Sequence, residues 1–146
     1  MTNGRDPDRP LMLSGRPMHE TLREQAPELA RWLTDIIAVE VETYAQMPDV
    51  ELQRDIVALV ELNLYLVANT FELRRAPTIE EMAPLRAAAA RGAQDSVPLS
   101  DILAAYHLGG RQAMTTLFAE PDPADYGDIV TAYSLLLDYN QAVSTE

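Results

Sequence analysis

Residues 96–111, SVPLSDILAAYHLGGR, carry the clearest helix signals in the chain, and the rest of the sequence can be read outward from them. Pro98 suits the first turn of a helix, and the apolar residues between Leu99 and Tyr106 recur at helical spacing. We expect the helix to continue through Gly109 and Gly110. Since a glycine inside a helix costs about 1 kcal/mol relative to alanine, the pair predicts a second backbone packed closely at this point.

The flanking sequence predicts four more helices separated by proline-containing breaks. Met47-Pro48-Asp49 ends the first of them, with Asp49 placed to cap the next. Thr78 and Glu81 fit a capping box before a short helix, which Gly92 is expected to end. The predicted helices span residues 18–46, 50–75, 79–91, 98–119 and 124–143. The chain is therefore predicted to be all-α, a bundle of four long helices and one short helix with antiparallel neighbours.

The apolar faces of these helices predict the core. Segment 50–75 is nearly apolar all round between Ile56 and Val67, which is typical of a helix at the centre of a bundle. Trp32 belongs to the apolar stripe of the first helix and is expected in the core or an interface. The last helix is expected to bury one broad face, which comprises Tyr126, Ile129, Val130, Tyr133, Leu136, Leu137 and Asn140.

Length, composition and charge bound the function. A chain of 146 residues with 47% hydrophobic content is enough for one domain with a real core. Residues 1–17 are rich in proline and glycine and are expected to form a flexible leader before a single domain at 18–146. The formal charge of −12 repels phosphate backbones, so we expect no direct nucleic-acid binding.

The chain also lacks the usual signals for export, disulfides and membranes. There is no cysteine, and all eleven basic residues are arginine, as is typical of a GC-rich bacterial gene. No signal peptide is visible, and no apolar run approaches the ~20 residues that cross a bilayer. We therefore expect a cytoplasmic protein without membrane contact.

Titratable residues offer few candidate sites, and no catalytic set is visible. His107 follows Tyr106 and should lie on the flank of its helix, as a structural or exposed residue; a ligand or pH-sensing role is the alternative. His19 is expected to be exposed. Asp122, Asp125 and Asp128 recur every three residues, which suits a hard cation, but negative charge near a helix start has a simpler explanation in the helix dipole. We expect no metal and no cofactor.

Polar and aromatic residues in the apolar helices are candidates for an interface or a pocket. Glu61 and Asn63 point about 200° apart on one helix, so at most one of them faces the core. A buried Asn63 would set register or line a cavity, and solvent contact is the alternative. Tyr65, Tyr106 and Tyr133 are expected in the core or an interface, with a small-molecule pocket as the other hypothesis, and Asn140 is a further candidate for the interface or pocket.

Two segments resemble a known family. VPLSDILAAYHLGGR resembles the VPL-D-LL-AY-LG-R segment in the N-terminal domain of actinobacterial PucR-type transcriptional regulators, a domain type also associated with RsbRD co-antagonist proteins. Upstream, RWLTDIIAVEVETYAQMPDVELQRDIVALVELNLYLV resembles that family's long helix, its Y-x-x-(L/M)-P-D-x-E-L turn and its second apolar helix. The resemblance spans about Pro27 to Asn140 and brings no catalytic motif. His107 departs from it, because a basic residue, often arginine, follows the tyrosine in the family.

The resemblance implies a non-enzymatic regulatory domain that senses a signal or self-associates. In that family the DNA-binding helix-turn-helix lies far toward the C-terminus, and a last helix ending close to residue 146 favours a fragment of a longer regulator. We expect a homodimer, with a small-molecule effector as a second candidate partner. Under this hypothesis a signal changes how the last two helices pack across the dimer, and the sensitive position comprises Tyr106, His107, Gly109, Gly110 and Arg111.

The alternative implied by the resemblance is a stand-alone module that docks on a partner in a stress-response signalling assembly. The two hypotheses predict different structures. A sensor should contain a cavity, whereas a docking module should have a compact core and an exposed apolar patch on one helical face.

Overall fold

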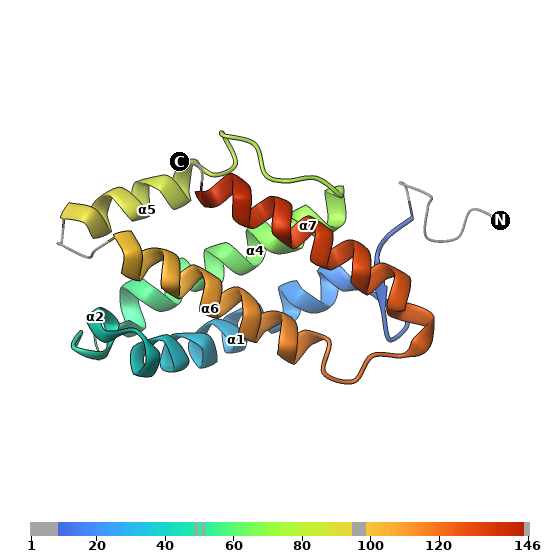
Figure 1. The fold of residues 1–146 in the computed structure, drawn as a ribbon, viewed down its shortest axis with the longest axis horizontal. Helices are drawn as coiled ribbons and strands as arrows, with labels where there is room; N and C mark the ends of the chain where they lie inside the picture. The colour runs from blue at the N-terminus through green and yellow to red at the C-terminus, as the bar shows by residue number, and fades with distance from the viewer. Residues whose placement is uncertain (1–8, 49, 51, 95–98, 145–146) are drawn as a thin grey trace.

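Long helices make up most of the structure, a computed structural model that describes residues 9–48, 50, 52–94 and 99–144. The four long helices are α1 (Met18–Glu40), α4 (Val57–Leu73), α6 (Leu99–Leu117) and α7 (Tyr126–Ser144), and α5 (Ala83–Gln94) is shorter. From α1 through α4, α5, α6 and α7, each helix runs opposite to the one before it (Figure 1). The prediction of an all-α bundle of four long helices and one short helix is confirmed.

The pair of α1 and α4 forms the centre of the bundle. These two helices pack closely along their lengths, α6 packs on α1, and α7 packs on α4. In the view of Figure 1, α6 and α7 lie in front of that pair. Leu22 and Leu33 of α1 and Phe71 of α4 are almost completely buried in the core between them. The apolar character of α4 on all sides follows from this central position.

Several helix ends differ from the predicted ones. Pro27 lies inside α1 without ending it, and the chain breaks instead at Val41, where the backbone turns extended before the single turn α2 (Glu42–Ala45). A π-helical turn, η2 (Leu52–Ile56), precedes α4. The predicted cap at Asp49 lies outside the described residues. A pattern of apolar residues does not encode these ends.

The capping box before α5 is confirmed. The Thr78 N–H donates to Glu81 Oε1 at 2.8 Å, and the Glu81 N–H donates to Thr78 Oγ1 at 3.2 Å. The α-helix itself begins later than predicted, at Ala83, and continues to Gln94. The expectation that Gly92 ends the helix is therefore wrong.

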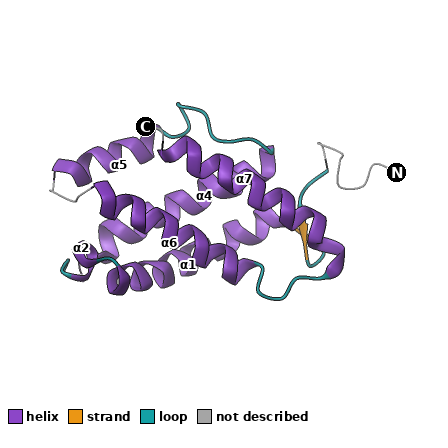
Figure 2. Ribbon diagram, viewed as in Figure 1, coloured by secondary structure: helices purple, strands orange, loops and turns teal. Residues whose placement is uncertain are grey.

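The expectation of a flexible leader at residues 1–17 is wrong for residues 9–17. Met12–Leu13 (β1) and Arg16–Pro17 (β2) pair as a small antiparallel hairpin (Figure 2). Leu11 is only 1% exposed, and its carbonyl oxygen accepts a 2.7 Å hydrogen bond from the Met18 N–H. Buried apolar side chains fix this segment although its composition resembles that of a loop.

The aspartates near the start of α7 hold this N-terminal segment in place. Asp128 is buried and accepts hydrogen bonds from Arg9 and, at 2.8 Å, from the Met12 N–H. Asp125 is also buried and accepts from the Ser14 N–H at 2.9 Å. Asp122 caps the 3₁₀ turn η3 (Pro123–Asp125) through the Ala124 N–H. Within the described part of the chain, no group of three His, Cys, Asp or Glu side chains is placed to hold a metal ion.

The exposure of His19, of Trp32 and of four residues on α7 differs from what their apolar or polar patterns suggested. His19 is buried rather than exposed, because α1 presses it against α4, where its Nε2 lies 3.8 Å from Glu72 Oε2. Trp32 is 43% exposed and lies outside the core. On α7, the buried side is made by Ala132, Leu135, Leu136 and Tyr139. Four residues of the predicted buried face point outward instead, namely Tyr126, Val130, Tyr133 and Leu137.

The segment Arg54–Leu73 is long and apolar enough to cross a membrane by length and composition, contrary to the expectation that no run approaches that length. In the structure α4 packs against α1, α5 and α7. A helix at the centre of a bundle can pass the same compositional test, and 33% of this window is buried inside the structure.

Candidate functional site

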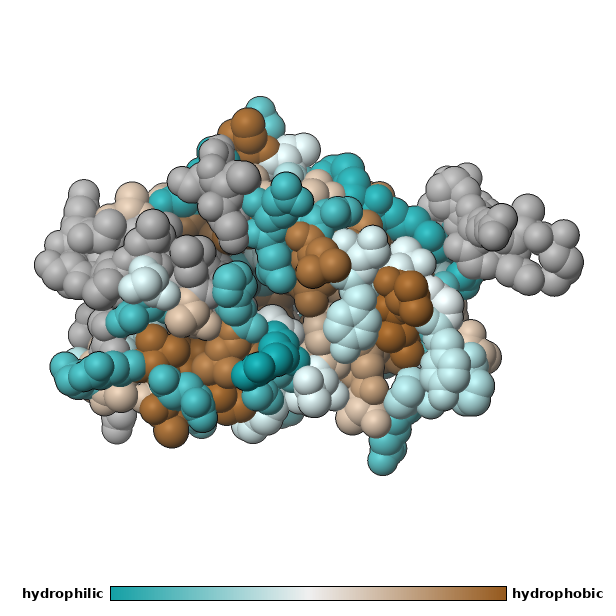
Figure 3. All heavy atoms as spheres, in the orientation of Figure 1, coloured by the Kyte–Doolittle hydropathy of each residue, from teal (hydrophilic) through white to brown (hydrophobic). Residues whose placement is uncertain are grey.

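An apolar cavity lies inside the bundle, between the central helices and the pair α6 and α7. The centre of a water-sized sphere can move through about 80 Å³ of it, and the space continues to the surface. Its walls are Leu33, Ile37, Tyr44, Ile56, Leu59, Val60, Asn63, Leu64, Val67, Ala105, Gly109, Gly110, Ala113, Met114, Leu136, Tyr139 and Asn140. The visible face is hollowed where α6 and α7 pass each other (Figure 3).

The cavity exists because α6 and α7 pack on different partners. The backbone of α6 lies against α1, while that of α7 lies against α4. The two helices meet through Phe118 and Tyr133, whose ring centroids are 5.5 Å apart at an interplanar angle of 50°. This contact lies near the connection between the helices. The wall residues Gly109 and Asn140 lie two to three turns away from that contact, where the helices leave the space open.

The glycine pair on α6 forms part of the cavity wall. A Cβ atom built on Gly110 would meet nothing within 4 Å, and one on Gly109 would lie 4.0 Å from Ile37 Cδ1, an ordinary contact. The expectation that a second backbone packs closely here is therefore wrong. The missing side chains leave room in the cavity, and an alanine would fit at either position.

Asn63 and Tyr139 form a hydrogen-bonded polar patch in the largely apolar cavity wall. The Tyr139 hydroxyl donates to Asn63 Oδ1 at 2.5 Å, and Asn63 Nδ2 donates to the Leu59 carbonyl oxygen at 3.1 Å. This network joins α4 to α7 across the cavity. Of the alternatives that the sequence left open for Asn63, the structure places it in the cavity wall. Asn140, half-buried, lies at the same wall.

Glu61 and Tyr65 form a separate pair on α4, away from the cavity wall. The Tyr65 hydroxyl donates to Glu61 Oε2 at 3.1 Å. Burial, together with the hydrogen bond to Glu61, raises the pKa of Tyr65 above its ordinary value. Both residues are half-buried, and the hydrogen bond between them gives each side chain a polar partner at the edge of the bundle.

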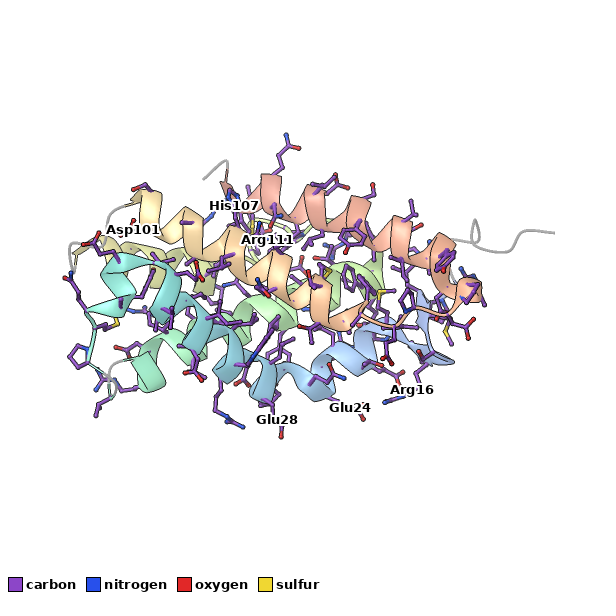
Figure 4. The ribbon with its side chains drawn as sticks, turned by 60° about the horizontal axis from the view of Figure 1, so that its bottom comes forward. Arg16, Glu24, Glu28, Asp101, His107 and Arg111 are labelled. Carbon is purple, nitrogen blue, oxygen red and sulfur yellow. The ribbon has the colours of Figure 1, made fainter. Side chains whose placement is uncertain are left out.

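Three other predicted site residues, His107, Arg111 and Tyr133, do not line the cavity. His107 and Arg111 are exposed and lie along the outside of α6 (Figure 4). The side chain of Tyr106 lies outside what the structure describes. Tyr133 stands on the outer side of α7, where it contacts Phe118. Among the members of the predicted α6 group whose side chains the structure describes, the two glycines line the cavity and His107 and Arg111 do not.

Sequence reasoning missed Tyr139 and the apolar walls contributed by Ile37, Met114 and Leu136. Tyr139 shares a face with Ala132, Leu135 and Leu136 at three- and four-residue spacing, and that repeat was the available signal. The walls could not be told from ordinary core residues, because a cavity is defined by what neighbouring helices fail to fill.

Fold and cavity together define a helical-bundle domain with an apolar interior space. Residues 27–146 match the family model of the RsbT co-antagonist protein rsbRD N-terminal domain. The chain belongs to this family, and it is a domain of a regulatory, signalling kind. The hairpin of residues 12–17 precedes the matched region. No curated protein and no solved structure gives a significant match.

Proposed function

We propose that this domain is the non-enzymatic input module of a PucR-type transcriptional regulator in the cytoplasm of an actinobacterium. In this proposal the cavity between α6 and α7 takes a small-molecule effector. Family membership supports a regulatory role, and the resemblance of residues 96–111 to PucR-type regulators supports the class of output. The cavity supports sensing over docking as the primary role.

The single observation that carries the proposal is the glycine pair in the cavity wall. Each glycine inside a helix lowers stability by about 1 kcal/mol relative to alanine. Neither Gly109 nor Gly110 is required by a close neighbour, since a Cβ atom would fit at both positions. Proteins commonly give up stability where function needs it. The open space itself is then the feature that the sequence maintains.

The same geometry supplies a way to transmit the signal. An effector in the cavity contacts α6 and α7 where they diverge, while Phe118 and Tyr133 hold them together near their connection. Occupancy therefore favours one separation of the two helices over another, and the change is carried along α7 to its C-terminal end near Asn140. An effector shifts this equilibrium only by the difference between its affinities for the two arrangements.

The proposal is tested by asking what the purified domain carries. Compounds are extracted from the wild type and from Gly110→Leu, whose added side chain occupies the cavity, and are identified by mass spectrometry. Thr116→Leu, an exposed position on the same helix, is the matched control. We expect a bound compound in the wild type and in Thr116→Leu, and at least tenfold less in Gly110→Leu.

Circular dichroism first establishes that both variants keep the helical content of the wild type. A wild-type domain that carries no compound, or a folded Gly110→Leu that carries the wild-type amount, would contradict the proposal.

A second candidate function, docking or self-association, is favoured by an exposed apolar surface on α7. Tyr126, Val130, Tyr133 and Leu137, here called the α7 outer stripe, recur at spacings of four, three and four residues and all face solvent. Large apolar side chains gathered on one helical face are typical of protein interfaces. Since Tyr133 also contacts Phe118 beside the cavity, self-association and sensing are compatible in one molecule.

A further inference from the structure

We infer that the cavity selects an uncharged, largely apolar molecule that carries one hydrogen-bonding group, with the chemistry of a short alkyl alcohol or ketone. This inference rests on the proposed sensing function and names the class of its effector. It follows from the charge, polarity and size of the cavity walls.

Charged effectors are disfavoured by the walls. No aspartate, glutamate, arginine or histidine is among the residues that line the cavity in the described part of the chain. A charge taken into an apolar space without a partner loses its hydration and gains nothing in return. The titratable side chains nearest to the glycine pair on α6, His107 and Arg111, lie exposed on its outside.

The polar patch has unused hydrogen-bonding capacity for a single group. Asn63 uses one amide hydrogen toward Leu59 and one oxygen lone pair toward Tyr139, which leaves a second donor and a second acceptor site on its amide. A hydroxyl group, which donates and accepts, or a carbonyl group, which accepts, would satisfy these sites.

The apolar remainder of the cavity is a poor site for water. One water needs roughly 10–15 Å³ of such space and two to four polar partners. The cavity offers about 80 Å³, and among its lining residues in the described part of the chain only Tyr44, Asn63, Tyr139 and Asn140 carry a polar side-chain group. Replacing poorly held water by an apolar group favours binding. The alkyl part of the effector would therefore lie against the glycine pair, while its polar group reaches Asn63.

Four six-carbon probes test this assignment on the intact chain: 1-hexanol, hexane, hexanoate and hexylammonium. They share an alkyl chain and differ in the end group. Binding is followed by two-dimensional NMR titration at neutral pH, with the Gly109 and Gly110 amide signals reporting on the cavity. We expect 1-hexanol to bind at least tenfold more tightly than either charged probe, and Gly110→Leu to abolish its binding.

The polar patch is tested with the double variant Asn63→Leu with Tyr139→Phe. We expect the preference for 1-hexanol over hexane to fall roughly fivefold or more, the ratio that one hydrogen bond of ordinary net strength gives. Asn69→Leu is the matched control on α4, since Asn69 bonds Arg23 and does not line the cavity. It should leave the preference unchanged.

Three outcomes would overturn the inference: a charged probe that binds as tightly as 1-hexanol, an unchanged preference in the double variant, or no binding of any probe. If no probe binds while the wild type still carries a compound that Gly110→Leu excludes, the effector class is wrong and the sensing function stands. If no probe binds and no compound is carried, both proposals fail.

Discussion

A glycine inside a helix can be required by a close neighbour or can serve to leave space open, and Gly110 allows the two explanations to be told apart. An added methyl group should lower the free energy of unfolding in the first case and raise it in the second. A Cβ atom at this position meets nothing within 4 Å. We therefore expect Gly110→Ala to raise the free energy of unfolding by roughly 0.5–1 kcal/mol, through helix propensity and a less flexible unfolded chain. Urea unfolding at 25 °C measures the change.

Gly127→Ala is the control for this effect, since Gly127 is a helical glycine on α7 with nothing within 4 Å and no part in the cavity. It should also stabilise or leave stability unchanged, without altering the binding of 1-hexanol. A lower stability of Gly110→Ala would mean that the site is more crowded than the structure indicates.

Individual residues also show where sequence reasoning stops. Helical spacing correctly allowed only one of Glu61 and Asn63 to face the interior, but it gave no means of choosing between them. Val130 was placed on the core-facing side and Trp32 in the core or an interface because both belong to apolar stripes, and both are exposed in the structure. On a helix that is apolar on two sides, periodicity gives the repeat and leaves the direction of the core open.

The N-terminal segment at residues 9–17 is the part of the fold that the sequence concealed most completely. Its prolines and glycines predicted a loop, whereas the segment docks through buried Leu11 and Leu13 and through the carboxylate of Asp128. The helices themselves, their number and their order could be predicted, because each carries its own local pattern and its own break. Docking of a loop onto a helix start depends on residues more than a hundred positions apart, and no local pattern records it.

The Asp128 carboxylate makes the stability of this docking depend on pH. Burial acts to raise the pKa of Asp128, but hydrogen bonds from Arg9 and the Met12 N–H, with the charge of Arg9, outweigh it and hold the pKa below its ordinary value. A carboxyl group whose pKa is lowered by folding stabilises the protein above its unfolded pKa, about 3.9. This contribution is lost as the pH falls through the lower, folded pKa.

We therefore expect Asp128→Asn to lose about 1–3 kcal/mol of stability at pH 7, because the Arg9 and Met12 donors lose their charged acceptor. The difference from the wild type should begin to shrink below about pH 4, where the unfolded chain binds the proton first, and should be lost as the pH falls through the lower pKa of the folded Asp128. Urea unfolding at pH 7, 5 and 3 measures both effects.

Glu24→Gln is the control for this series. The hydrogen bond and charge of Arg16 lower the pKa of Glu24 too, but both side chains are exposed on the surface (Figure 4). Solvent screening makes such a pair worth little, so no measurable change is expected. A difference between Asp128→Asn and the wild type that stays constant from pH 7 to pH 3 would rule out the carboxylate as its source.

The cavity arises from the arrangement of four helices and could not be predicted from any one of them. The sequence correctly singled out the glycine pair. It predicted a closely packed second backbone at this point, whereas the structure has an open space there. Leu136 and Asn140 line the cavity, and Leu137 of the α7 outer stripe directly follows Leu136 on the solvent side of the same helix. A partner that covers the stripe therefore sits beside the cavity, and binding at one surface can bias the other.

Net charge decides what kind of partner suits the α7 outer stripe. The chain carries a formal charge of −12, so two copies repel each other except where their contact is uncharged. Gly127, Ser134, Asp138 and Gln141 flank the stripe on one side, and Ile129 and Asn140 flank it on the other. An antiparallel pair of α7 helices would place Tyr126 opposite Leu137 and Val130 opposite Tyr133, so the stripe residues themselves meet without a charge and Asp138 lies at the edge of the contact. These features favour a second copy of the chain.

Val130→Glu tests this arrangement, because Val130 is 69% exposed and its replacement adds a charge at the centre of the proposed contact without touching the core. We expect the wild type to sediment as a homodimer that tightens as salt is raised, since salt screens the repulsion between the acidic subunits. Val130→Glu should sediment as a monomer at the same concentration. Ile79→Glu, at an exposed apolar position between α4 and α5, should remain dimeric. A monomeric wild type, or a Val130→Glu variant that is as dimeric as Ile79→Glu, would remove self-association through α7 and leave the stripe to a different protein.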